Sequence, residues 1–317
     1  MQKQDVIDCH ARISPYVHDT PVLTSRLINT KVGAEVYFKC ENFQRAGAYK
    51  IRGATNAILQ LSDEQRSKGV VTHSSGNFAQ ALSLAAQSLK VPAHIVMPSS
   101  APQVKKIGVL EYGGTIYECK PTLGARQRMA DQIAKETGAV FLHPSNNEHV
   151  ILGQGTAAFE LLTERPDLNY IFCPVGGGGL IAGSAIAAKH FGESCKIIGG
   201  EPFEADDAYR SLQTGKIEGN NTVNTIADGL KTTLGDKNFP IIKKHVTKIV
   251  RVTENEIVVA MRLVWERMKI IIEPSSAVTV AALIRDAEEN PKEYMRKKAG
   301  IIISGGNVDL GDLPFGK

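Results

Sequence analysis

A run of four consecutive glycines, Gly176-Gly177-Gly178-Gly179, is the first candidate for chemistry in this chain. The run follows the apolar segment 171–175 and precedes the helix-like segment 180–188. Glycine has no side chain, so several backbone N–H groups of such a turn can approach one phosphate, and the N-terminus of the next helix favours negative charge. The pattern therefore predicts a phosphate-binding turn between a strand and a helix.

Lys50 is the candidate reactive amine. The small residues 46–48 let backbone and ligand approach closely, and Lys50 begins the buried face of a helix-like pattern. Pyridoxal phosphate chemistry needs a lysine that forms an imine with the cofactor aldehyde and then acts as a base. Two polar turns, Ser74-Ser75-Gly76-Asn77 and Ser304-Gly305-Gly306-Asn307, supply further hydroxyl and N–H groups. Together these segments predict a site for pyridoxal phosphate.

The same residues leave other interpretations open. The spacing Gly177-x-Gly179-x-x-Ala182 fits a dinucleotide fingerprint, and Glu201 ends the next strand-like run, where a ribose-binding acid would lie. Four glycines in a row offer more free N–H donors than a pyrophosphate turn needs, which favours a compact phosphate. A noncatalytic or NAD-binding protein, in which Lys50 has no chemical role, is the alternative from another class.

The composition predicts a globular protein of about two domains. The chain has 317 residues, of which 43% are hydrophobic and 22% charged, with a net charge of +4 carried by scattered Lys and Arg. No apolar leader opens the sequence and no run approaches the ~20 apolar residues of a membrane span. We therefore expect a cytoplasmic protein with no membrane and no nucleic-acid partner.

The cysteines predict neither disulfides nor a zinc site. Their number is odd, they are widely spaced, and no two form a C-x-x-C pair. We expect most of these five residues to be buried thiols: Cys9, Cys40, Cys119, Cys173 and Cys195.

Short β-branched runs alternate with longer helical patterns, which predicts an α/β fold with mostly parallel sheets. Three strand-like units between about 69 and 146 indicate a smaller lobe. The expected strands cover residues 35–40, 93–97, 115–119, 170–175, 196–200, 248–252 and 300–304. The expected helices cover residues 50–61, 77–88, 123–137, 180–191, 254–269 and 275–290.

A set of motifs, in order along almost the entire chain, carries a family resemblance. The chain resembles the serine/threonine dehydratase family of fold type II pyridoxal phosphate enzymes, and in particular its serine-racemising members. The motifs are Glu41-Asn42-Phe43-Gln44, Lys50, His73-Ser74-Ser75-Gly76-Asn77, Gly153-Gln154-Gly155-Thr156, the tetraglycine, Thr225-Ile226-Ala227-Asp228-Gly229, Glu273-Pro274 and Ser304-Gly305-Gly306-Asn307.

The resemblance implies a tryptophan-synthase β-like fold with two parallel-sheet α/β domains and the cofactor in the cleft between them. Residues 1–68 and 147–317 would form the large cofactor-binding domain, and residues 69–146 the small domain. It also implies a homodimer acting on a small amino acid.

By the same resemblance, Lys50 is the imine-forming lysine and one base for the α-proton, while Ser75 is the second base on the opposite face. Two bases on two faces permit racemisation. The implied cofactor-binding residues are Lys50, Asn77, Gly176, Gly177, Gly178, Gly179 and Ser304. The implied substrate-binding residues are Ser74, Ser75, Asn77, Arg126 and Thr232.

The implied activity is racemisation of serine together with β-elimination from serine or threonine to a 2-oxo acid and ammonia. The chain departs from the family pattern at Phe78, where histidine is usual, and at Ser145, where asparagine is expected. Serine substitutions in the second loop also occur in aspartate racemases of the family. A 3-hydroxyaspartate ammonia-lyase or an aspartate racemase is therefore the alternative, with Arg126 as candidate partner for a second carboxylate.

Two further ligands follow from the resemblance. Glu201, the carbonyl of Ala205 and Asp207 would bind Mg²⁺ or Ca²⁺, which prefer oxygen ligands. Taken without the resemblance, the same stretch is an acidic surface loop. ATP would act as an allosteric effector, at positions matched here by Gln80, Tyr112, Lys269 and Asn307.

Overall fold

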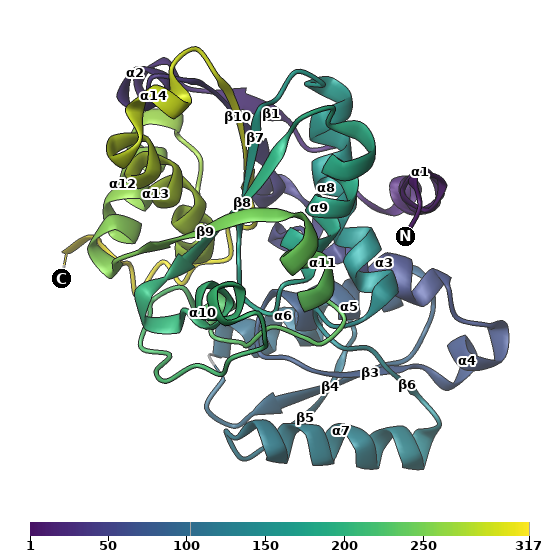
Figure 1. The fold of residues 1–317 in the computed structure, drawn as a ribbon. Helices are drawn as coiled ribbons and strands as arrows, with labels where there is room; N and C mark the ends of the chain where they lie inside the picture. Colours follow the sequence, from purple (N-terminus) through teal and green to yellow (C-terminus); the bar gives the residue numbers. More distant parts are fainter. Residues whose placement is uncertain (102, 317) are drawn as a thin grey trace.

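Two separate sheets organise the chain (Figure 1). The computed structural model describes residues 1–101 and 103–316. The larger sheet has the strand order β1-β2-β10-β7-β8-β9 and the smaller one β5-β4-β3-β6. Neighbouring strands run parallel in both sheets, except that β1 pairs antiparallel with β2. This arrangement confirms the predicted α/β class.

The larger sheet is buried on both faces. In β7, Tyr170 and Phe172 face the core beneath α13, while Ile171 and Cys173 face the core beneath α8 and α9. A strand covered on both sides must be apolar at every position, which explains the continuous apolar run before the glycines. The strands are β1 (Val22–Thr24), β2 (Glu35–Cys40), β7 (Tyr170–Pro174), β8 (Lys196–Pro202), β9 (Val246–Val252) and β10 (Lys298–Ile303).

Helices with one broad apolar face cover this sheet. On the left of Figure 1, α12 and α13 lie together, and α8 and α9 lie on the right. Their sequence ranges are α1 (Lys3–Ile13), α2 (Arg26–Val32), α3 (Lys50–Leu59), α8 (Glu148–Glu164), α9 (Gly179–Phe191), α10 (Asp207–Thr214), α11 (Phe239–His245), α12 (Glu254–Met268), α13 (Pro274–Glu289) and α14 (Pro291–Tyr294).

The smaller sheet lies at the bottom of Figure 1. Its strands are β3 (Val70–His73), β4 (Ala93–Pro98), β5 (Thr115–Cys119) and β6 (Val140–Phe141). The helices within or next to this stretch of the chain are α4 (Asp63–Lys68), α5 (Asn77–Ser88), α6 (Gln103–Glu111) and α7 (Leu123–Thr137). We propose that residues 69–146 form the small domain and the rest of the chain the large one, because all four strands fall inside that range.

The strand order of the smaller sheet has a topological switch point between β3 and β6, the place where an open α/β sheet offers a crevice. Connections from β3 lead toward β4 on one side, whereas β6 returns to the other side of β3. Ligands of open α/β sheets bind at such a switch point, outside the carboxyl ends of the strands. β3 ends at His73, directly before Ser74, and the loop 143–147 follows β6 closely. This topology places both segments at the crevice.

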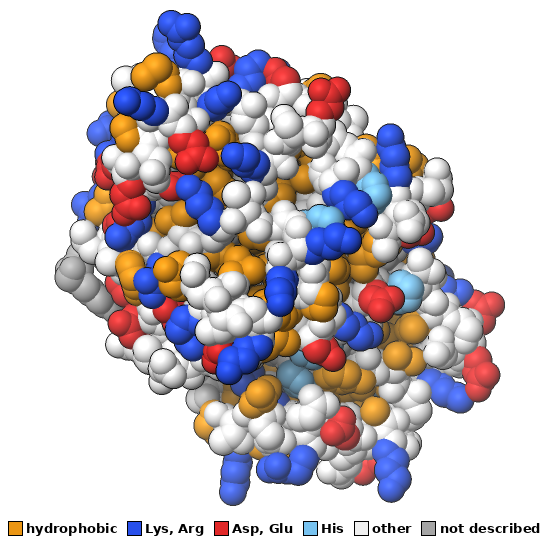
Figure 2. Space-filling view, in the orientation of Figure 1, with side chains coloured by type: hydrophobic (Ala, Val, Ile, Leu, Met, Phe, Trp, Pro, Cys, Tyr) orange, Lys and Arg blue, Asp and Glu red, His pale blue; other side chains and the backbone are white. Residues whose placement is uncertain are grey.

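Surface charge is mixed on the face seen in Figure 2, where Lys and Arg lie interspersed with Asp and Glu. Among residues 1–101 and 103–316, no helix combines the length and apolar character that a bilayer crossing needs. All five cysteines are free thiols, and four of them are buried.

Helix α8 is the largest element that the sequence pattern did not predict. It contains Gly153 and Gly155, and glycine disfavours helix interiors. Here glycine is required by packing: an ideal Cβ on Gly153 would lie 2.6 Å from the carbonyl oxygen of Arg52, and one on Gly155 would lie 2.5 Å from that of Gly183. The glycines therefore let α8 approach α3 on one side and α9 on the other.

We expect Gly153→Ala to destabilise the fold by about 1–3 kcal/mol, because the added methyl group forces two backbones apart. Gly124→Ala on α7 is the matched control, since the nearest atom to its ideal Cβ is the mobile end of Arg128 at 3.2 Å. That control should be neutral or stabilising by up to about 1 kcal/mol. Chemical denaturation measures both, and equal effects of the two variants would contradict the packing explanation.

Candidate active site

Lys50 is the first residue of α3 and has a half-buried side chain. Its Nζ donates a hydrogen bond to the carbonyl oxygen of Pro144, at 3.1 Å. Burial lowers the pKa of Lys50 to about 8, against the opposing effect of the Glu273 carboxylate. A lysine with such a pKa is partly neutral near physiological pH, which is the form that attacks an aldehyde or accepts a proton.

The backbone before Lys50 is held against the end of β10. The N–H of Tyr49 donates to the carbonyl oxygen of Ser304 at 3.0 Å, and Ala48 forms an isolated bridge with Gly305. Ser304 is 2% exposed, and its hydroxyl lies 2.9 Å from that of Ser276. The lysine turn and the Ser304 turn, far apart in sequence, therefore lie side by side as predicted for one site.

The four glycines form a tightly enclosed turn between β7 and α9. Gly178 has a φ of +84°, and an ideal Cβ there would lie 2.8 Å from the side chain of Leu234. An ideal Cβ on Gly176 would lie 2.9 Å from the carbonyl oxygen of Gly229. Side chains are excluded by this space, so the turn keeps the open backbone that a phosphate requires.

Polar side chains border the turn. An ideal Cβ on Gly177 would meet the hydroxyl of Ser145 and would lie 3.4 Å from that of Thr232. Within the described residues, Oε1 of Gln154 is buried without a hydrogen-bond partner, and it lies 2.5 Å from an ideal Cβ on Gly179. An orphaned buried polar atom at a backbone cradle fits a site built for a polar group.

Asn77 connects the smaller lobe to the larger one. Its Nδ2 donates to both carboxylate oxygens of Glu273, at 2.9 and 3.0 Å, and its Oδ1 accepts from Nδ2 of Asn307 at 3.0 Å. Burial, with a contribution from Asp228, raises the pKa of Glu273 to about 7. Glu273 was named only as part of the Glu273-Pro274 motif and had no predicted role. An acid before a proline at a helix start is an ordinary surface pattern.

The remaining substrate candidates lie in two places. Ser74 and Ser75 occupy the turn between β3 and α5, where the Ser74 hydroxyl accepts from the N–H of Gly76 at 3.4 Å. Arg126 lies on α7. Its charge adds to the effect of burial, which lowers the pKa of His73, and opposes the effect of burial on Cys119, whose pKa is raised. In the part of the chain that is described, Nε of Arg126 is buried without a partner. No hydrogen bond among these residues joins Arg126 to the Lys50 group.

The loop 143–147 is held by a neutral histidine. Nδ1 of His143 accepts from the N–H groups of Ser145 and Asn146, at 3.2 and 2.9 Å, so this nitrogen carries no proton. Burial lowers the pKa of His143 to about 4, which keeps the ring neutral. The loop that bonds Lys50 is thereby fixed in shape.

The predicted cation ligands bring two buried carboxylates together. Glu201, at the end of β8, accepts from the N–H groups of Ala208 and Tyr209 at 3.0 and 2.8 Å, and burial raises its pKa well above the usual value. Asp207 accepts from the N–H of Leu234 at 2.9 Å, and burial raises its pKa to about 6. Among residues 1–101 and 103–316, no cluster of three or more His, Cys, Asp or Glu side chains suits a metal.

The four nucleotide candidates are spread over several elements. Asn307 is tied to the carbonyl oxygen of Ala46 at 2.8 Å, and Lys269 ends α12 in a left-handed conformation. Gln80 lies on α5, next to Gly108 of α6, and Tyr112 directly follows α6. Their use by a nucleotide stays a prediction.

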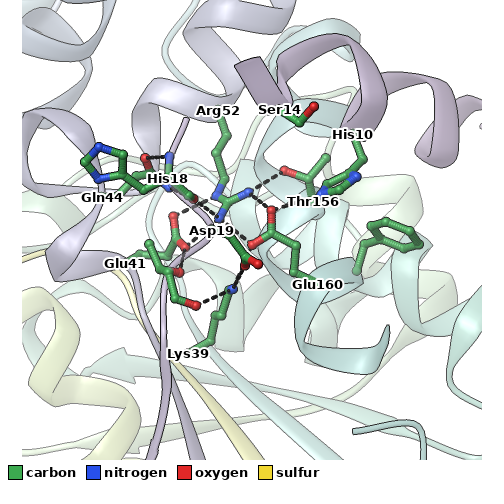
Figure 3. Close-up of polar contacts among 12 residues, drawn as sticks. His10, Ser14, His18, Asp19, Lys39, Glu41, Gln44, Arg52, Thr156 and Glu160 are labelled. Carbon is green, nitrogen blue, oxygen red and sulfur yellow. Dashed lines mark hydrogen bonds and ion pairs between the residues drawn. The ribbon is translucent and has the colours of Figure 1, made fainter. Parts of the chain in front are cut away.

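A buried ion network anchors the helix that begins with Lys50 (Figure 3). Arg52 is 0% exposed and donates to Glu41 from Nε and Nη2, at 2.7 and 2.8 Å. It also donates to Glu160 at 2.6 and 2.7 Å, and Lys39 reaches the same carboxylate at 2.7 Å. Burial alone would raise the pKa of Glu160, but the surrounding cations hold it well below the usual range. The sequence pattern did not predict this network.

Comparisons with known proteins bear on the whole chain. Residues 13–305 match the family described as pyridoxal-phosphate dependent enzyme. The chain is 50% identical to the serine racemase of Dictyostelium discoideum over 312 residues, 98% of this chain and 96% of that protein. It is 47% identical to L-threo-3-hydroxyaspartate ammonia-lyase of Saccharomyces cerevisiae, over 96% and 93% of the two chains. The crystal structure of the Dictyostelium discoideum racemase superposes with a TM-score of 0.92 at 51% identity, covering 97% and 98% of the two chains.

We expect the amine of Lys50 in the ligand-free protein to titrate near pH 8 instead of 10.5. Because the neutral amine is the nucleophile, its acylation rate should rise with pH and level off above about 8, whereas an ordinary lysine keeps gaining reactivity toward its higher pKa. Competitive labelling with acetic anhydride, read on the Lys50 peptide by mass spectrometry against N-acetyl-lysine amide, measures this. A profile that parallels the standard would contradict the burial effect.

Proposed function

Because the chain belongs to the family of pyridoxal-phosphate dependent enzymes, we propose that it interconverts L- and D-serine and also eliminates ammonia from serine or threonine. The observation that supports the proposal is the half-buried amine of Lys50, with a pKa of about 8, which lies beside the Ser304 turn and bonds the loop that packs on the glycine turn. The chain shares 50% sequence identity with the serine racemase of Dictyostelium discoideum over 98% of its length, which supports the choice of substrate.

The proposed roles are those that the family resemblance implies for these positions. When bound, pyridoxal phosphate supplies the electron sink that makes the α-hydrogen of an amino acid acidic. Lys50 on α3 exchanges a proton on one face of the substrate, and Ser75 on the β3–α5 turn does so on the other. Racemisation needs such a proton-transfer group on each of the two faces.

Other residues would bind and orient the cofactor and the substrate. The backbone N–H groups of Gly176, Gly177, Gly178 and Gly179 would hold the phosphate, and Asn77 would bind the phenolic oxygen of the ring. Ser304 would serve the ring nitrogen, where a neutral hydroxyl can hydrogen-bond but cannot hold an added proton as a carboxylate does. Ser74, Asn77, Arg126 and Thr232 receive the substrate.

Racemisation and elimination compete at this one site. Elimination loses hydroxide from the β-carbon after the same proton has been removed, so the ratio of products depends on the difference between two barriers. A difference of ~1.4 kcal/mol already changes that ratio tenfold.

A second candidate is action on a β-hydroxy amino acid with two carboxylates, as the name of the yeast relative suggests. The observation that favours it is the buried Nε of Arg126, which has no hydrogen-bond partner among the described residues. Ser145, at the edge of the glycine turn, offers a further hydroxyl. Product analysis with L-serine, L-aspartate and 3-hydroxyaspartate separates the two candidates.

Lys50→Ala and Ser75→Ala test the two-base proposal. Lys50→Ala should abolish the cofactor adduct that borohydride reduction traps on the chain. Ser75→Ala should lower racemisation by about 10²-fold or more, while elimination from one enantiomer of serine persists through Lys50. Chiral chromatography and pyruvate formation measure the reactions.

Ser88→Ala, an exposed change at the end of α5, is the control for Ser75→Ala and should leave both reactions unchanged. Intact racemisation in Ser75→Ala would rule out Ser75 as the second base. A wild-type protein that binds no pyridoxal phosphate would overturn the function itself.

We also propose that Glu201, the carbonyl of Ala205 and Asp207 bind Mg²⁺ or Ca²⁺. Support comes from burial: both carboxylates are 0% exposed, and the hydrogen bonds that Glu201 accepts from the described residues come from backbone N–H groups. Two buried carboxylates repel each other, and a divalent cation between them would remove that repulsion.

Glu201→Gln tests the cation site. Mg²⁺ at about 100 times its Kd should stabilise the wild-type protein by about 2.7 kcal/mol. Glu201→Gln should abolish that gain. In metal-free buffer, the same substitution should remove the repulsion between the carboxylates at positions 201 and 207. Thermal unfolding with and without MgCl₂ measures both effects. Glu204→Gln, on the same loop but half-exposed, should behave like wild type. A Mg²⁺ shift retained in Glu201→Gln would exclude this carboxylate as a ligand.

The remaining proposals rest on the resemblance. ATP would act as an effector at Gln80, Tyr112, Lys269 and Asn307, and the protein would be a homodimer. A cytoplasmic location agrees with five free cysteines, since reducing compartments keep thiols unpaired.

A further inference from the structure

We propose that Asn238 is a positioning residue that holds the glycine turn and the loop 143–147 in one arrangement and so sets the affinity for the cofactor phosphate. The inference rests on the proposed use of the turn as a phosphate site. Asn238 is 0% exposed and directly precedes α11. Its Nδ2 donates to the carbonyl oxygen of Gly177 at 2.5 Å and to that of Ser145 at 3.2 Å.

The first of these bonds orients a peptide group of the turn. In a trans peptide the C=O and the following N–H point in opposite directions. Holding the carbonyl of Gly177 toward Asn238 therefore directs the N–H of Gly178 away from Asn238, toward the open side of the turn. A phosphate cradle works only when its N–H groups converge and its carbonyl oxygens point outward.

The second bond fixes the neighbouring loop. Ser145 packs directly on the turn, because an ideal Cβ on Gly179 would lie 3.0 Å from its carbonyl oxygen. The residue before it, Pro144, accepts the hydrogen bond from Nζ of Lys50. One amide group thus connects the phosphate end of the site with the loop that orients the reactive amine.

A second asparagine joins the same two segments. Nδ2 of Asn146 donates to Asp236 at 2.7 Å, and its Oδ1 accepts from the N–H of Lys237 at 2.9 Å. These bonds keep the segment 235–238 in register with the loop 143–147. Asn238 is therefore held in place from both sides.

Ordinary structural roles do not account for Asn238. It occupies the N-cap position of α11 but makes no side-chain capping bond. Within the described residues its Oδ1 is buried without a partner, which costs free energy that an apolar side chain of the same size would avoid. An amide that is kept at this cost, and whose donor group bonds two carbonyl groups of the site, points to a functional constraint.

The test compares a phosphorylated and an unphosphorylated ligand on the full-length protein after its cofactor has been removed. Asn238→Leu keeps the size and deletes both donors. We expect its Kd for pyridoxal phosphate to rise by about 10- to 100-fold, and its Kd for pyridoxal, which lacks the phosphate, to change less than twofold. Absorbance titration measures both constants. Asn238→Asp also lacks the donors, and it should shift the ratio of the Kd for pyridoxal phosphate to the Kd for pyridoxal in the same direction. This variant replaces Asn238→Leu in the test if the leucine variant does not fold.

Asn56→Leu is the matched control. Asn56 is also 0% exposed and donates to a backbone carbonyl, that of His149 at 2.8 Å, but it lies on α3 outside the turn. The Asn56→Leu substitution should lower thermal stability without changing the ratio of the two dissociation constants. An unchanged ratio in both Asn238 variants, or an equal loss for both ligands, would overturn the inference. If the wild-type protein binds no pyridoxal phosphate, the proposed function fails instead.

Discussion

The geometry of the site depends on a buried guanidinium two residues after the reactive amine. Arg52 and the side chains around it place four charges in a space that excludes water, and each charge is tolerated only because its partners are within hydrogen-bond distance. The partners come from β2 and the turn after it, from α3 and from α8. Displacing any one of these elements would expose an uncompensated charge. The first turn of α3, and with it Lys50, is therefore positioned by electrostatics as well as by packing.

Small residues provide the complementary constraint. Glycines on α8 let it touch α3 and α9 at backbone distance, and glycines at the start of α9 leave amides free at its N-terminus. The same property, the missing Cβ, thus serves close helix packing in one place and anion binding in another. Segment 228–238 borders the glycine turn and also bonds Asp207, so the candidate phosphate and cation sites share one stretch of chain.

The sequence predicted the parts of the fold that rest on local pattern. Both β2 and β5 have the expected limits, as do α5 and α7, because apolar periodicity and caps are local signals. Helix α8 was missed, since its glycines obey tertiary packing and not helix propensity. Motifs identified Lys50, the glycine turn and Ser304, which the structure brings together. Glu273 and Asn238 were not assigned roles, because a buried acid or amide is recognisable only from the partners that surround it.

Two crossings of the chain and several side-chain contacts join the two lobes. The chain passes between the sheets twice, before β3 and after β6, and the second passage is the segment whose Pro144 carbonyl binds Lys50. Elsewhere the lobes meet through polar pairs such as Asn77 with Glu273 and Lys105 with Asp228, and through a shared apolar core in which α3 packs against α5. The helix that begins with Lys50 therefore lies in a core shared by both lobes, so a shift of the smaller lobe would be transmitted to the reactive amine.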